Sequence, residues 1–152
     1  MPALRIDVRI DPPFRAEAPA PWLRGVAATA LKAEGVGRAE LGIVVTDDET
    51  VRELNRTYAQ EDAPTDVLSF SLEEGESFPV PDAVRRLGEV VISLPTARRQ
   101  AEAAGRPLRE EVAHLLVHGI LHLLGYDHAE PQDEKRMRER ETAILTEVFR
   151  EN

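Results

Sequence analysis

The segment Leu108–Leu124 constrains the fold of this 152-residue chain more than any other feature. Its apolar side chains point in nearly every direction around a helix of about 3.6 residues per turn, and a helix that is apolar all round is buried. A narrow polar stripe interrupts it, made of Glu111, His114, His118 and His122. Buried polar groups need hydrogen-bond partners or a metal ion. The segment therefore predicts a central helix that carries a polar site.

The histidines continue into the run HGILHLLGYDH, which predicts a metal site with three histidine ligands. Residues four apart share one helix face with Cβ atoms about 5–6 Å apart, so His118 and His122 can bind one ion. Gly125 suits a left-handed residue that ends the helix and reverses the chain. The reversal would bring His128 back to the metal as the third ligand.

Two further residues bear on the ligand set. His114 offers a competing set with His118 and His122, but a rise of about 1.5 Å per residue separates the outer two by roughly 12 Å, too far for one small ion. We therefore prefer His128, and expect His114 to be a hydrogen-bond partner of the ligands or a wall of the pocket. Asp127 is either a fourth ligand or, as we prefer, another such partner.

The ligand types favour a catalytic zinc ion. Structural zinc sites close with four protein ligands, commonly including cysteine, and this chain has no cysteine. Three histidines leave room for a bound water. The spacing matches the metzincin peptidase signature HExxHxxGxxH, but Gly119 replaces the glutamate that acts there as general base, so peptidase chemistry is disfavoured. The alternative is a set of core histidines bonded to carboxylates.

The histidine run resembles the signature of the YbeY family, bacterial metal-dependent endoribonucleases that mature ribosomal RNA. Two other segments are similar to that family: LNRTYAQEDAPTDVLSF, from Leu54 to Phe70, and LGEVVIS, from Leu87 to Ser93. One departure is Ala59, where many members have an arginine thought to help with RNA, so the role of that arginine does not transfer. The resemblance extends roughly over residues 41–145.

The resemblance implies one zinc ion per chain, bound by His118, His122 and His128. It also places the strand that begins near Thr65 beside the metal. There Thr65, Asp66 and Ser69 would contact the substrate or support the metal ligands, and the alternative is that Thr65 and Asp66 only cap the strand.

The implied activity is a single-strand-specific, zinc-dependent endoribonuclease that acts in 16S rRNA 3′-end maturation and ribosome quality control. Its partners would be rRNA, the small ribosomal subunit, a protein of that subunit and a ribosome-associated GTPase, and its location the cytoplasm. Two alternatives remain: a ribosome assembly factor with a structural zinc and, less favoured, a metallopeptidase.

Charge and length set limits on these hypotheses. The net charge of −9 opposes general nucleic-acid binding, because affinity for phosphates comes largely from basic side chains. Clusters such as Arg98 with Arg99 are interpreted as solvated helix faces paired with acids, and a local basic rim is the alternative. No apolar run approaches about 20 residues, so no membrane partner is expected. The length predicts one domain, residues 1–152.

Hydrophobic periodicity predicts an α+β domain, a small mixed four-stranded sheet packed with about five helices, with the metal site on the central buried helix and the following turn. The predicted strands are 4–10, 41–46, 66–72 and 87–93. The predicted helices are 22–34, 49–58 with Asp48 as N-cap, 95–104, 107–124 and 131–150, and a loop covers 73–81. Gly88 is expected to allow close backbone approach or to serve packing.

Overall fold

The computed structural model describes residues 4–59, 65–72, 84–126 and 130–150. Four strands form one mixed sheet in the order β1-β2-β4-β3, with β1, β2 and β4 parallel and β3 antiparallel at one edge. Their bounds are Leu4–Ile10 (β1), Ala39–Thr46 (β2), Val67–Ser71 (β3) and Arg85–Ser93 (β4). The predicted α+β class and mixed four-stranded sheet are confirmed.

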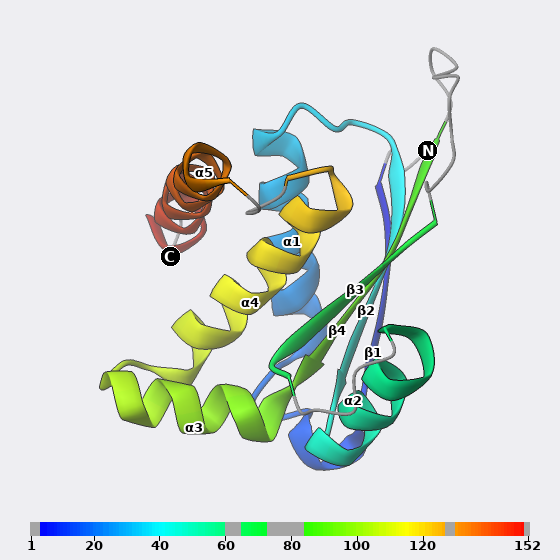
Figure 1. Ribbon diagram of the computed structural model, residues 1–152, viewed down its shortest axis with the longest axis vertical. Coiled ribbons are helices and arrows are strands. Elements are labelled where there is room, and N and C mark those ends of the chain that lie inside the picture. The colour runs from blue at the N-terminus through cyan, green and yellow to red at the C-terminus, as the bar shows by residue number, and fades with distance from the viewer. Residues whose placement is uncertain (1–3, 60–64, 73–83, 127–129, 151–152) are drawn as a thin grey trace.

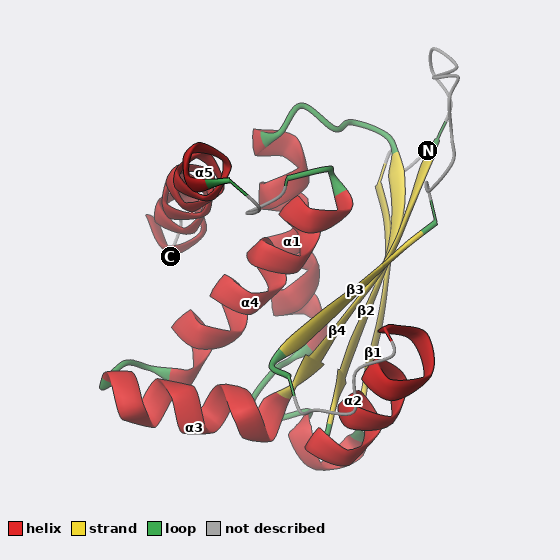
Figure 2. Cartoon of the chain, viewed as in Figure 1, coloured by secondary structure: helices red, strands yellow, loops and turns green. Residues whose placement is uncertain are grey.

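Helices cover the two faces of the sheet unequally (Figures 1 and 2). Helices α1 and α4 lie on one face with α5 packed outside them, α2 lies on the other face, and α3 lies at one end of the sheet beside α4. Their bounds are Ala20–Ala33 (α1), Asp48–Leu54 (α2), Leu94–Ala104 (α3), Leu108–Leu123 (α4) and Pro131–Arg150 (α5). None of the described helices is long and apolar enough to cross a membrane.

The predicted element boundaries agree with the structure to within two residues, with one exception. The predicted helix 49–58 divides into α2 and a π-helical turn, η2 (Asn55–Ala59). A short 3₁₀ turn, η1 (Pro12–Phe14), lies in the proline-rich segment before α1. The predicted loop 73–81 lies outside the described residues.

Helix α4 is the centre of the core, as its sequence predicts. Its apolar residues are buried on the sheet side and on the side covered by α1 and α5, and Leu116, Ile120 and Leu121 have no exposed surface. Helix α5 supplies the outer part of the core through one face, which contains Met137, Ile144 and Val148, with Leu145 half-buried beside them. This agrees with the predicted apolar face of the last helix.

Two glycines let backbone segments approach closely. A Cβ on Gly119 would lie 2.6 Å from Val90 Cγ1 and 3.2 Å from Ser69 Oγ, so α4 packs directly against β4 and β3. A Cβ on Gly88 would lie 1.9 Å from the carbonyl oxygen of Phe70, and Gly88 has a φ of +129° that favours glycine. Close approach of β3, one of the two expected roles of Gly88, is confirmed.

The predicted N-cap of α2 is wrong by one residue. Asp47, in an extended conformation, is the N-cap, and its Oδ1 accepts a hydrogen bond of 2.7 Å from the backbone N–H of Thr50. Asp48 is the first helical residue instead. The two neighbouring aspartates are both suitable caps by type, and the tertiary position of Asp48 decides between them.

The Asp48 carboxylate joins α2 to the start of α3. It accepts hydrogen bonds from Ser93 Oγ, from Thr96 Oγ1 at 2.6 Å and from an Arg99 guanidinium nitrogen at 2.9 Å. Burial opposes the charge of Asp48, but these bonds outweigh it and hold the pKa of Asp48 below its ordinary value of 3.8. The link fixes β4, α2 and α3 at the end of the sheet.

We predict opposite effects for one substitution at two helical glycines. Gly119→Ala should lower the free energy of unfolding by about 1–3 kcal/mol, because the new methyl group overpacks the contact with Val90. Gly25→Ala, in α1, should raise it by about 0.5–1 kcal/mol, because no atom lies within 4 Å of the new Cβ and alanine favours the helix. Urea unfolding of both variants measures this, and a stabilised Gly119→Ala protein would contradict the packing.

We also predict that Asp48 makes stability depend on pH. A carboxyl with a lowered folded-state pKa stabilises the fold above its ordinary pKa of 3.8, and this contribution is lost as the pH falls through the lowered value. Asp48→Asn should therefore lower the free energy of unfolding at pH 7. Below pH 4 the variant should lose less of this free energy than wild type does. Urea unfolding over this pH range tests it against Asp7→Asn, an exposed control; equal curves for wild type and Asp48→Asn would contradict it.

Candidate functional site

A cleft of about 440 Å³ opens between the second half of α4 and the edge strand β3. Its lining combines six residues of the segment 65–71 with three residues of α4, namely Thr65, Asp66, Val67, Leu68, Ser69, Ser71, His118, His122 and Leu123. The structure therefore brings together two of the predicted metal ligands with the three residues predicted to act beside them. This volume is typical of a small-ligand site.

His118 and His122 lie one helical turn apart and both border the cleft. Their ring centroids are 4.7 Å apart and the ring planes are nearly perpendicular, at 81°. The predicted third ligand, His128, and its neighbour Asp127 lie outside the described residues. Within the described part of the chain, no group of three histidine, cysteine or acidic side chains is arranged to hold a metal ion.

The turn after α4 has the predicted chain reversal. Gly125 has a φ of +102°, its N–H donates to the carbonyl of His122 at 3.0 Å, and the N–H of Tyr126 donates to the carbonyl of Leu121 at 3.0 Å. This pair of bonds is the Schellman arrangement that ends a helix at glycine. The prediction that Gly125 ends the helix is confirmed.

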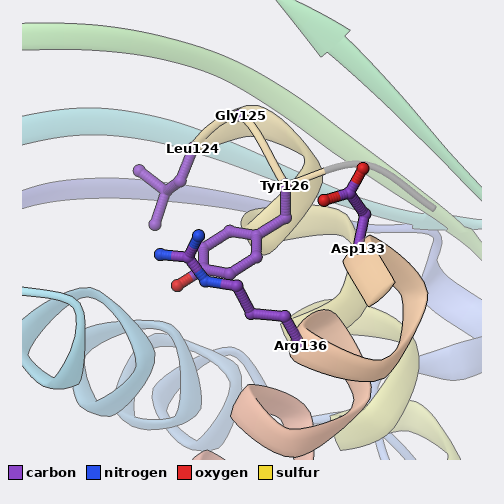
Figure 3. A pocket seen from close by; sticks show the side chains of 5 residues that line it. All are labelled: Leu124, Gly125, Tyr126, Asp133 and Arg136. Atoms are coloured by element: carbon purple, nitrogen blue, oxygen red, sulfur yellow. The ribbon is translucent and has the colours of Figure 1, made fainter. Parts of the chain in front are cut away.

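The turn is fixed by Glu34, the residue that follows α1, and by side chains of α5. The hydroxyl of Tyr126 donates to Glu34 Oε1 at 2.5 Å, and Arg140 Nε donates to Glu34 Oε2 at 2.7 Å. Arg136 lies over the Tyr126 ring, with its guanidinium carbon 5.6 Å from the ring centroid. Figure 3 shows this contact in a second hollow of about 310 Å³, with Asp133 on its other side. These contacts hold the turn through Tyr126 against α1 and α5.

Glu141, on α5, is the residue of this site that the sequence analysis missed. It is only 7% exposed, and its two oxygens bond to two histidines of α4: Oε1 to His114 Nε2 at 3.0 Å and Oε2 to His118 Nδ1 at 2.6 Å. Burial opposes its charge, but the two bonds lower the pKa of Glu141 to about 2. The sequence did contain a signal for a buried acid, because Glu141 shares the apolar face of α5 with Met137 and Ile144.

His114 lies one turn behind His118 and does not line the cleft. Its Nδ1 is 3.4 Å from a guanidinium nitrogen of Arg106, whose Nε donates to the buried Glu111 at 3.1 Å. The hydrogen bond to Glu141 raises the pKa of His114, against the opposing effect of burial. Every residue of the polar stripe up to His118 thus has a charged or hydrogen-bonding partner.

Asp66 and Ser69 both line the cleft and both also hold β3 in place. Asp66 Oδ2 accepts from Gln100 Nε2 at 3.2 Å, and the backbone carbonyl of Asp66 accepts from the N–H of Ser93 at 3.0 Å. The hydroxyl of Ser69 donates to the carbonyl of Gly119 at 3.0 Å. Thr65 Oγ1 lies 3.5 Å from Asp66 Oδ1. A structural role for these side chains is therefore real, and a role in substrate contact stays a prediction.

The clustered arginines mostly pair with carboxylates, as we favoured for each cluster. Ion pairs connect Arg98 with Glu17, Arg99 with Asp48, Arg106 with Glu111, Arg138 with Glu134 and Arg140 with Glu34. These contacts offset positive charge locally, so they do not support a broad basic surface formed by these five arginines.

Comparisons with known proteins show what this chain is similar to. The model of the family described as Endoribonuclease YbeY matches residues 11–149. An endoribonuclease YbeY of Dehalococcoides mccartyi is 44% identical over 155 residues, covering 95% of this chain and 97% of the relative. That of Aquifex aeolicus is 50% identical over 120 residues, covering 78% and 77%. A solution structure of a Thermotoga maritima protein shares the fold, with a TM-score of 0.66 at 24% identity over 96% and 90% of the two chains.

We predict that the hydroxyl of Ser69 stabilises the fold through its bond to α4. The Ser69→Ala variant should lose about 0.5–1.5 kcal/mol of unfolding free energy, the usual net value of a hydrogen bond, because the bond to Gly119 is lost. Thr29→Ala is the control, since its hydroxyl donates to a carbonyl of its own helix. It should be neutral or slightly stabilising. Unchanged stability of Ser69→Ala in chemical denaturation would contradict the structural role.

Proposed function

Because the chain belongs to the endoribonuclease YbeY family, we propose that it is a zinc-dependent endoribonuclease that cleaves single-stranded RNA. The observation that carries the proposal is the cleft in which His118 and His122 face the segment 65–71. The physiological reaction proposed is 16S rRNA 3′-end maturation with ribosome quality control. Its partners would be the small ribosomal subunit, one of its proteins and a ribosome-associated GTPase, in the cytoplasm.

The donor set in the cleft suits zinc. Metal-binding histidines usually donate their second ring N–H to a carboxylate, and His118 Nδ1 contacts Glu141 in this way. Nε2 of His118 would then hold the ion, together with His122 and His128. A zinc ion at three protein ligands supplies Lewis acidity towards a phosphoryl oxygen and lowers the pKa of a bound water to about 7.

The remaining lining of the cleft would orient the RNA. The hydroxyl hydrogen of Ser69 is used by Gly119, so Ser69 Oγ can only accept a bond from the substrate. Among the described lining residues, Asp66 has the only carboxylate, which repels phosphate and accepts hydrogen bonds from donors. Both side chains therefore suit ribose hydroxyls or base amino groups, with the phosphate turned towards the histidines.

The packing at residue 119 argues against a peptidase. A metzincin needs a glutamate there as general base, but Gly119 is buried and its Cβ position already lies within 2.6 Å of Val90. The helix could not keep its contact with β4 and also carry a glutamate. A ribosome assembly factor with a structural zinc remains the alternative that the next experiment separates.

We predict that His122→Ala abolishes zinc-dependent cleavage of a single-stranded RNA that carries a 16S rRNA 3′ extension. The loss should be about 100-fold or more, because one ligand of the ion is removed. Wild type, His122→Ala and the surface control Arg138→Ala are purified identically and assayed with and without added zinc. Melting curves confirm that the variants are folded.

Cleavage by zinc-loaded wild type and Arg138→Ala, but not by His122→Ala, supports a metallo-ribonuclease. Equal cleavage by all three proteins would mean that a contaminating nuclease is responsible. In that case the structural-zinc alternative would replace the proposed function.

A further inference from the structure

The donor and the acceptor of each hydrogen bond behind His118 can be assigned, beginning with Arg106. A guanidinium group can only donate hydrogen bonds, and one of its nitrogens lies 3.4 Å from His114 Nδ1. The carboxylate of Glu111 holds the same guanidinium through Nε at 3.1 Å. Nδ1 of His114 is therefore the acceptor, and the ring proton of neutral His114 lies on Nε2.

Glu141 accepts a hydrogen bond from each of the two histidines. An ionised carboxylate can only accept, so Oε1 accepts the Nε2–H of His114 at 3.0 Å, and Oε2 accepts the Nδ1–H of His118 at 2.6 Å. The ring of neutral His118 then has its proton on Nδ1. Its Nε2 has a lone pair, and the residue borders the cleft.

We propose that Glu141 is a positioning residue that fixes His118 as its Nδ1–H tautomer, and that Arg106 and His114 hold Glu141 in this role. The consequence for zinc rests on the proposed function, because the tautomer matters for metal binding only if His118 is a ligand. The tautomer itself is a property of the metal-free protein.

Apolar packing alone does not explain Glu141. Its neighbours on the inner face of α5 are Met137, Ile144 and Val148, and an apolar residue of similar size would pack there without the cost of burying a charge. Glu141 instead places both oxygens on histidines of the same polar stripe. The arrangement matches the carboxylate support that metal-binding histidines commonly have.

The isosteric variant Glu141→Gln tests the direction of the bonds. Glutamine has one acceptor and one donor side, so the N–H groups of His114 and His118 compete for its single oxygen. Where His114 keeps that oxygen, the amide NH₂ faces His118 Nδ1 and drives the proton to Nε2. Long-range ¹H–¹⁵N spectra of the metal-free protein at neutral pH measure this tautomer directly, with the His118 signal identified by its loss in His118→Gln.

We predict the Nδ1–H tautomer of His118 in wild type and an increased share of the Nε2–H tautomer in Glu141→Gln. Zinc binding, measured by competition with a chromogenic chelator, should weaken about 10–100-fold in Glu141→Gln. Glu139→Gln, the same change at an exposed position of the same helix, should leave both readouts unchanged. Glu141→Gln with His114→Ala should recover part of the affinity, because the glutamine oxygen is then available to His118.

The outcomes separate this inference from the proposed function. An Nε2–H tautomer in metal-free wild type overturns the inference, even if Glu141→Gln does not fold. The inference is also overturned if folded Glu141→Gln keeps the wild-type tautomer of His118 and the wild-type zinc affinity. If wild type shows the Nδ1–H tautomer but binds no zinc, the positioning role stands and the proposed function fails.

Discussion

The contact between α4 and the sheet at Gly119 determines where everything else in the site can lie. Because no side chain separates the helix from Val90 and Ser69, α4 lies directly on β4 and β3. This places His118 and His122, at the cleft end of the polar stripe, at the edge of the sheet, where a cleft remains open. The same close contact removes the position where a metzincin would have its catalytic glutamate. Gly119 thus sets how closely α4 packs on the sheet and also leaves no side chain that could act as a general base.

The second constraint is the cost of burying polar groups in such a helix. Each member of the stripe up to His118 is matched by a partner from the α3–α4 turn, from α4 or from α5, and Glu141 supplies the partner for two histidines at once. In the described residues, no buried side-chain nitrogen or oxygen lacks a hydrogen-bond partner. The polar groups from Arg106 to Glu141 thus form one connected set of hydrogen bonds along a largely buried helix.

Local patterns in the sequence predicted most of the fold, because period 2 and period 3.6 are properties of single elements. They predicted β1 and α5 at the observed bounds, the α+β class, and the shared face of His118 and His122. They failed for residues whose role depends on a partner far away in the sequence. Asp48 was mistaken for a cap because its partners, Ser93 at the end of β4 and Thr96 in α3, are 45 and 48 residues away in sequence, and Glu141 was missed because its histidines lie on another helix.

The central claim is that the cleft beside β3 is a zinc site built on His118 and His122. Anomalous diffraction at the zinc absorption edge, from crystals grown with one equivalent of zinc, tests this claim most directly. The account predicts one strong peak, from a zinc ion bonded to Nε2 of His118 and to His122, on the side of α4 that faces Ser69. A peak elsewhere on the chain, or bonding through His114, would contradict it.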